Sequence, residues 1–316
     1  VNDDMPFLVD SVISELNRLG CGIHLIVHPQ LVVRRTVTGE LLEVLDLGPG
    51  DWHGGDHPHD SLVESWTHVE IDRQTLPSRQ EEITRELRRV LEDVRVAVED
   101  WPMMMTRVSE IISDLAVNPP VGIDQKEVAE ARTLLAWLAE GNFTFLGYRE
   151  YRLADAHEGQ DDVLVAETGT GLGILRHDAT TSSGYDRLSS AARARAREKN
   201  LLVVTKANSR ATVHRSVYLD YIGVKTFDAT GEVVGERRFL GLFASSAYTD
   251  SVRRIPLVNR KVAEVLERSG FAEETHSGKD LLQILETYPR DELFDISVDD
   301  LATISRAVMD MQQRRR

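Results

Sequence analysis

The loop between residues 51 and 60 concentrates side chains that bind transition metals. It holds three aspartates and the three histidines His53, His57 and His59. Imidazole and carboxylate groups are ligands for zinc and related ions. Two glycines and a proline in the same stretch favour a mobile surface turn, whereas metal ligands usually stand on firm elements with supporting hydrogen bonds. We therefore expect a turn and keep a metal-binding module built on these histidines as an alternative.

The first residues of the chain have the composition of a small-ligand site. The polar residues Asn2, Asp3 and Asp4 stand before Pro6, and an apolar pattern at helical spacing follows. A proline at the first helical position leaves N–H groups exposed at the helix start, and such a start can hold a small carboxylate. The simpler alternative is that Asp3 and Asp4 only cap the helix. We take Asn2, Asp3, Asp4 and Pro6 as the candidate effector-binding residues.

The rest of the sequence contains no recognisable catalytic or cofactor-binding motif. Gly169, Gly171 and Gly173 lack the G-x-G-x-x-G spacing of a dinucleotide-binding turn, and a polar loop follows them where that motif opens a helix. The single cysteine, Cys21, has no histidine nearer in sequence than His24, and no Gly-x-Ser-x-Gly elbow occurs. We therefore expect a plain glycine turn, an inert thiol, and neither a catalytic residue nor a cofactor in this chain.

The overall composition excludes several classes of protein. A formal net charge of -15 argues against a nucleic-acid partner, because binding to phosphates requires a basic face. No apolar run approaches the roughly 20 residues that span a bilayer, and the start carries no secretory signal. One cysteine excludes an internal disulfide and fits a reducing compartment. We expect a cytoplasmic protein with no nucleic-acid and no membrane partner.

Helical and strand patterns predict an α+β fold that would position these residues. The Asn-Pro-Pro run at 118–120 is the clearest boundary. We expect a first domain over residues 1–118, a connector helix over 119–141, and an antiparallel-sheet domain over 142–316 whose C-terminal helices cover one sheet face. The expected helices span 6–19, 77–94, 103–115, 124–140, 255–268, 278–287 and 298–313, with Asp124 and Ser297 as N-caps. The expected strands span 23–37, 41–47, 65–71, 143–153, 162–166, 201–206, 213–227 and 233–245.

The segment from Asp4 to Val9 resembles the strand-to-helix junction of ACT domains. The pattern of that junction runs approximately Asp-x-Pro-Gly-Leu-Leu, and here it reads Asp-Met-Pro-Phe-Leu-Val. A helix, two strands and a helix follow, as in the βαββαβ order of the ACT fold. The resemblance implies an ACT-like α/β sandwich whose first strand lies upstream of Val1.

Four longer phrases resemble the N-terminal region of the large bacterial NAD-dependent glutamate dehydrogenases. They are NDDMPFLVDS at 2–11, EIDR at 70–73, NFTFLGYR at 142–149 and ETYPRDELF at 286–294. In that family this region carries ACT-like modules, a PAS-type module and helical motifs. Oxidative deamination of glutamate with NAD occurs in a separate downstream domain, and the enzyme is a homo-oligomer.

The resemblance implies a regulatory and oligomerisation segment, inactive alone, whose partners are its own catalytic domain and other subunits. An amino acid is the implied effector, and the second sheet domain is either PAS-type or ACT-like. One departure argues against an effector, because Phe7 stands where ligand-binding ACT domains have a glycine that lets the ligand approach the backbone. Assembly without a ligand is therefore an alternative, as is an autonomous enzyme whose site the sequence does not reveal.

Overall fold

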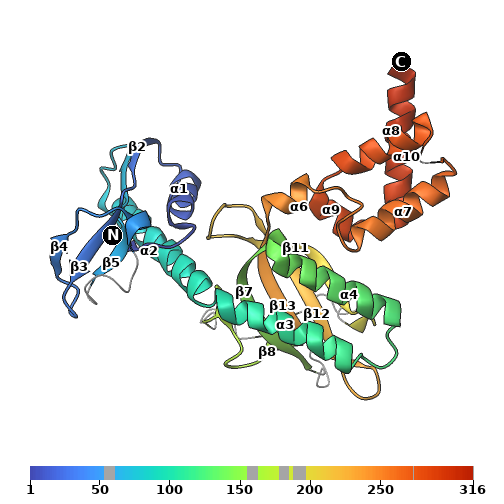
Figure 1. The fold of residues 1–316 in the computed structure, drawn as a ribbon, viewed down its shortest axis with the longest axis horizontal. Coiled ribbons are helices and arrows are strands. Elements are labelled where there is room, and N and C mark those ends of the chain that lie inside the picture. The colour runs from blue at the N-terminus through green and yellow to red at the C-terminus, as the bar shows by residue number, and fades with distance from the viewer. Residues whose placement is uncertain (53–60, 155–162, 178–184, 188–196, 273, 316) are drawn as a thin grey trace. The chain divides into compact units, whose positions relative to one another are not determined.

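The computed structural model describes residues 1–52, 61–154, 163–177, 185–187, 197–272 and 274–315 (Figure 1). Packing of the backbone divides the chain into two compact units. The first unit is Val1–Glu99 with Arg210–Val217, and the second is Asp100–Ser209 with Tyr218–Arg316. The boundary expected at residue 118 falls within the second unit, between two helices that pack together there.

The first unit combines two helices with short antiparallel strands. Strand β5 lies between β1 and β3 and is antiparallel to both. Strands β1 and β3 are therefore parallel to each other, and α1 connects them in a split βαβ arrangement. The elements are β1 (Asn2–Asp3), α1 (Leu8–Arg18), β2 (Ile23–Val27), β3 (Gln30–Arg35), β4 (Leu41–Val44), the 3-10 turn Pro49–Asp51, β5 (Ser61–Ser65), β6 (His68–Ile71) and α2 (Pro77–Glu99). This topology confirms the ACT-like fold.

Strand β1 differs from the expectation that the first strand lies wholly upstream of Val1. Asn2 is opposite Ser65 and Asp3 is opposite Glu64 in the β5 ladder. The ladder continues with the backbone N–H of Asp4, which donates to the carbonyl of Val63 at 3.1 Å. The candidate residues Asn2, Asp3 and Asp4 are thus fixed by backbone pairing to the sheet.

Helix α1 forms because its apolar residues repeat on one face. Leu8 and Leu16 are buried, and Gly20 ends the helix region with a φ of +71°, a conformation that glycine adopts without strain. Leu16, Cys21 and Ile83 of α2 form the core beneath the helix pair. The thiol of Cys21 is buried there as a small apolar group, as expected.

The second unit is built on an antiparallel sheet. The strand order is β10-β8-β7-β13-β12-β11, and the two-residue strand β9 also pairs with β7. The strands are β7 (Phe143–Ala154), β8 (Val163–Ala166), β9 (Leu172–Gly173), β10 (Tyr185–Arg187), β11 (Leu202–Arg210), β12 (Tyr218–Phe227) and β13 (Val233–Phe243). The antiparallel sheet was expected, but β12 begins at Tyr218, five residues later than the start predicted at 213.

Helices α3 (Trp101–Val117) and α4 (Gln125–Trp137) lie across this sheet (Figure 1). Met104 and Leu134 from these helices share one core with Phe145 and Phe239 of the strands. The C-terminal helices were expected to cover the sheet, and that expectation is wrong. They pack mainly on one another, and Phe294 stacks on Phe243 of β13 with ring centroids 4.9 Å apart. They are α6 (Ser245–Thr249), α7 (Val258–Ser269), α8 (His276–Thr287), α9 (Arg290–Asp295) and α10 (Val298–Arg315).

Candidate functional site

The candidate effector residues lie at the junction between β1 and α1. Helix α1 begins at Leu8 with Phe7 as its N-cap, so Pro6 stands before the helix and not at its first position. No side chain caps the helix start. The alternative in which Asp3 and Asp4 serve only as helix caps is therefore excluded, and both carboxylates are available for other contacts.

Phe7 keeps the backbone conformation that a glycine would adopt at this position. Its φ is +71°, in the left-handed region that favours glycine. Its ring does not fold back over the strand end, because it packs against the imidazole of His214 with ring centroids 5.2 Å apart. The departure from the ACT pattern thus changes the side chain at this junction and keeps the turn of the backbone.

Arg95 of α2 joins two of the candidate residues. Its guanidinium donates to the amide oxygen of Asn2 and forms an ion pair with Asp3 at 3.3 Å. Asp4 accepts a hydrogen bond from Gln30 at 2.8 Å. The side chains of Asp3 and Arg95 are 57% and 36% exposed, so both charges face water. The structure therefore places a carboxylate and a guanidinium side by side at the junction.

A cavity of about 270 Å³ adjoins Asn2. It lies inside the first unit, and its lining residues come from α1, from α2 and from the strands β5 and β6. Its lining is mainly apolar and includes Leu8, Val12, Val69 and Leu87. A cavity of this kind accepts an apolar group whose polar end remains at the Asn2 side.

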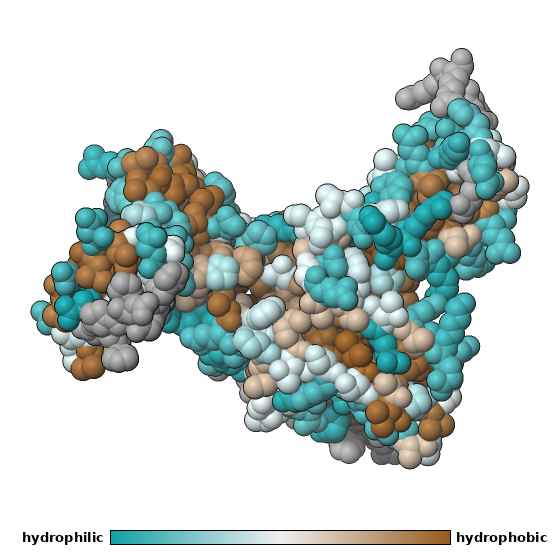
Figure 2. Space-filling view, viewed as in Figure 1, coloured by the Kyte–Doolittle hydropathy of each residue, from teal (hydrophilic) through white to brown (hydrophobic). Residues whose placement is uncertain are grey.

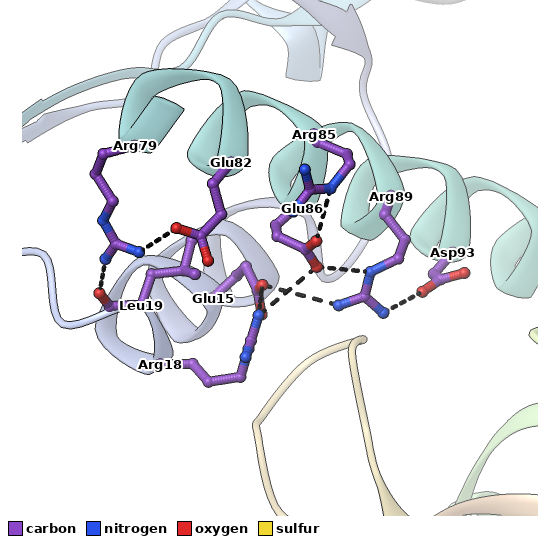
Figure 3. A network of polar contacts seen from close by, with 9 residues as sticks. All are labelled: Glu15, Arg18, Leu19, Arg79, Glu82, Arg85, Glu86, Arg89 and Asp93. Carbon is purple, nitrogen blue, oxygen red and sulfur yellow. Dashed lines mark hydrogen bonds and ion pairs between the residues drawn. The ribbon is translucent and has the colours of Figure 1, made fainter. Parts of the chain in front are cut away.

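A network of charged side chains holds α1 on α2 (Figure 3). Glu15 of α1 is 4% exposed and accepts hydrogen bonds from Arg18. Arg89 of α2 lies 3.8 Å from the same carboxylate and also bonds Glu86 at 3.0 Å. Because a buried carboxylate is stable only when it is paired, this network fixes the position of α1 and with it the junction.

The other motifs noted in the sequence have structural roles or lie outside the described residues. His53, His57 and His59 are outside them, and the described part of the chain holds no group of three or more potential metal ligands. Gly173 belongs to β9 and has a φ of +58°, so the glycine series is a turn packed on β7 and not the start of a helix.

The phrase at 286–294 also has a structural role. Glu286 accepts hydrogen bonds from the Ser251 hydroxyl at 2.6 Å, from the Val252 amide at 3.2 Å and from Arg290 at 3.1 Å. Arg290 is itself buried and donates to the Asp250 carbonyl. These bonds attach α8 and α9 to the segment that follows α6.

Comparisons with known proteins agree with this arrangement. Residues 1–87 match the family model described as glutamate dehydrogenase, ACT1 domain, and residues 255–314 match glutamate dehydrogenase, helical motif 1. The chain is 39% identical over 314 residues to the NAD-specific glutamate dehydrogenase of Pseudomonas aeruginosa and 37% identical over 320 residues to that of Halomonas elongata. These alignments cover 99% and 100% of the chain.

Almost the whole chain is therefore similar to one part of the NAD-specific glutamate dehydrogenases. The enzyme of that name from Mycobacterium tuberculosis is 32% identical over 98% of the chain. The chain spans about a fifth of the length of the curated relatives it matches.

The ACT1 match contains the junction and ends inside α2, and the helical-motif match contains α7 to α9 and all but the last residue of α10. No helix in the described ranges is long and apolar enough to cross a membrane. Arg95 was missed by the sequence analysis. It is 92 residues from Asp3, and nothing local in α2 distinguishes it from the other arginines of that helix.

Proposed function

We propose that this chain is a non-catalytic regulatory segment of an NAD-dependent glutamate dehydrogenase, and that it binds a free amino acid at the junction between β1 and α1. In this proposal a separate domain of the longer protein uses NAD to deaminate L-glutamate oxidatively to 2-oxoglutarate and ammonia. The observation that carries the proposal is the exposed pair of Asp3 and Arg95, whose guanidinium also bonds Asn2, a residue that lines the mainly apolar cavity.

The chemistry of an amino acid fits these groups. Its ammonium would bind the carboxylates of Asp3 and Asp4, and its carboxylate would bind the guanidinium of Arg95 through charge-assisted hydrogen bonds. Its side chain would enter the cavity next to Asn2. Pro6 would restrict the backbone that presents these groups. Regulation then requires that the ligand bind one arrangement of the enzyme more tightly than another.

A thermal-shift screen of the chain against the common amino acids tests this proposal. A ligand that binds only the native state raises the melting temperature. We expect a saturable rise in melting temperature with at least one amino acid, and loss of that rise in Asp3→Asn. The control Asp46→Asn, which changes an exposed carboxylate in the loop after β4, should retain the rise. The absence of a rise with every amino acid would contradict the proposal.

Subunit assembly is a second candidate function, and the exposed strands of the first unit favour it. Leu25, Ile26 and Val27 of β2 and Leu42 and Val44 of β4 are between 37% and 52% exposed. Hydrophobic residues, which are brown in Figure 2, gather in the region where Figure 1 labels β2, β3 and β4. Apolar strands at the edge of a sheet pair readily with other chains. Other subunits of a homo-oligomer or the enzyme's own catalytic domain would cover them.

The strand order of the second unit supports the further proposal that this unit is PAS-type. When the two- and three-residue strands β9 and β10 are left out, the strands β7, β8, β11, β12 and β13, numbered along the chain, lie in the order second, first, fifth, fourth, third. This is the order typical of a PAS sheet and differs from the split βαβ arrangement of the first unit. We therefore propose that the second unit is PAS-type and not a further ACT-like module.

A further inference from the structure

Residues 211–217, here called the docking loop, bind the first turns of α1. Within the first unit, the backbone N–H of His214 donates to the Ser11 hydroxyl at 2.8 Å, and the N–H of Ser216 donates to the Ser14 hydroxyl at 2.9 Å. Serines three residues apart lie on the same face of a helix, so both acceptors point to one side of α1. The loop is thus attached at two points along the helix.

Along residues 214–217, the backbone amides alternate between hydrogen bonds to α1 and hydrogen bonds within the docking loop. The N–H of Arg215 donates to the Val213 carbonyl at 3.1 Å, and the N–H of Val217 donates to the Arg215 carbonyl at 2.9 Å. The intervening amides of His214 and Ser216 have no partner inside the loop and bond the two serines. This alternation makes the loop complementary to the serine face of α1.

Burial shows that the contact is a packed one. Ser11 and Val213 are fully buried, and Ala211 is 4% exposed. The Asp93 carboxylate of α2 accepts a hydrogen bond from Thr212, and His214 lies 3.3 Å from Asp10. His214 has a φ of +72°, and a non-glycine residue holds that conformation only when its surroundings enforce it.

Phe7 connects the docking loop to the candidate effector site. Its carbonyl accepts hydrogen bonds from the Ser11 N–H at 3.0 Å and the Ser11 hydroxyl at 2.6 Å, and its ring contacts His214. It directly follows Pro6 in the sequence. Any movement of residues 2–6 that turns Phe7 therefore alters both the ring contact and the serine that receives the His214 amide.

We propose that the docking loop senses the conformation of residues 2–7 through the ring of Phe7 and through Ser11 and Ser14 of α1. Binding of the loop to α1 and ordering of residues 2–7 are then linked: the factor by which loop binding favours the ordering equals the factor by which the ordering favours loop binding. The linkage concerns the chain without a ligand. The linkage can therefore be correct even if the chain binds no amino acid, and the amino-acid proposal can be correct without the linkage.

Hydrogen exchange at single amides of the 316-residue chain tests the docking itself. In the double variant Ser11→Ala, Ser14→Ala, we expect the amides of His214 and Ser216 to exchange about tenfold faster or more, because each loses its hydrogen-bond acceptor. Ser109→Ala is the matched control, since its hydroxyl bonds only the Met105 carbonyl of its own helix. Unchanged exchange in the double variant would overturn the proposal.

The coupling is tested by Pro6→Gly, which changes a residue outside both the docking loop and α1. We expect faster exchange at His214 and Ser216 in this variant and, reciprocally, faster exchange at the Asp4 amide in Ser14→Ala. The amides of β3, whose residues Val32 and Val33 are fully buried, must stay protected in both variants to show that the fold is intact. If Pro6→Gly leaves both loop amides unchanged while the serine variants free them, the loop is docked but not coupled, and the proposal fails.

Discussion

Glu64 and Asp220 are both buried carboxylates, but their surroundings shift their pKa values in opposite directions. The hydrogen bonds from the Arg35 guanidinium, joined by one from the Trp66 indole, lower the pKa of Glu64. Burial raises the pKa of Asp220, and the Lys206 ammonium at 2.6 Å only partly offsets this effect. Glu64 lies opposite Asp3 in the β1–β5 ladder, so it is next to the strand that carries the candidate site.

Glu64→Gln should destabilise the chain at neutral pH and much less in acid. Because the folded pKa of Glu64 is below its unfolded value of about 4.3, the ionised form stabilises the fold above that pH and loses this effect as the pH falls through the folded pKa. Urea unfolding at pH 7 should show a loss of about 1–3 kcal/mol. The loss should shrink below about pH 4. Glu43→Gln, in an exposed ion pair with Arg34, should cost under about 0.5 kcal/mol. A loss that is constant with pH would contradict this assignment.

At the level of single residues, the sequence predicts the part of the site that is contiguous. Asn2, Asp3, Asp4 and Pro6 stand within five positions, so their composition and the following helix pattern are enough to single them out as candidates. Arg95 comes from the far end of α2, and only the packing of that helix brings it to Asp3. Long-range contacts of this kind leave no periodic signal in a single sequence.

At the level of elements, local patterns predict most helices and their ends correctly. Asp124 caps α4 by accepting the Lys126 amide at 2.8 Å, as the sequence predicts. Strand β12 is shorter than predicted, although residues 213–217 continue its β-branched pattern, because the amides of His214 and Ser216 bond α1 and not a neighbouring strand. The short helices α6 and α9 have too few residues to show a helical period.

Ser297→Ala should destabilise helical motif 1. The Ser297 hydroxyl accepts the Asp300 amide at 3.0 Å and donates to the Asp300 carboxylate at 2.7 Å, so it satisfies an N–H of the first turn of α10. We expect a loss of about 1 kcal/mol in the free energy of unfolding, measured by urea denaturation. Thr303→Ala is the control, since its hydroxyl bonds the carbonyl of Asp299 in the same helix. Equal losses in the two variants would argue against the cap.

At the level of the whole molecule, the chain joins regions that match the ACT1 domain and helical motif 1 to a second antiparallel sheet. It spans about a fifth of the length of the curated relatives it matches. The exposed apolar strands β2 and β4 belong to the ACT1 match. The proposed regulatory role requires contacts with other parts of a larger enzyme, and we propose that these strands are the surface that such contacts bury.

Leu42→Lys should weaken association between copies of the chain. A charged side chain in an edge strand prevents pairing with another edge. Sedimentation velocity should show concentration-dependent association of the wild-type chain and less of it in this variant. Leu76→Lys, at a residue that is 66% exposed but outside the strands, should behave as the wild type does. Equal association in both variants would place the assembly surface elsewhere.

Calorimetric titration of the chain with the amino acid found in the thermal screen tests the regulatory proposal most directly. Arg95→Met removes the guanidinium that would hold the ligand carboxylate, and Arg88→Met removes an exposed arginine of the same helix. We expect saturable binding by the wild type and by Arg88→Met, and binding at least about tenfold weaker in Arg95→Met. Undiminished binding by Arg95→Met, or no binding of any amino acid by the wild type, would contradict the account.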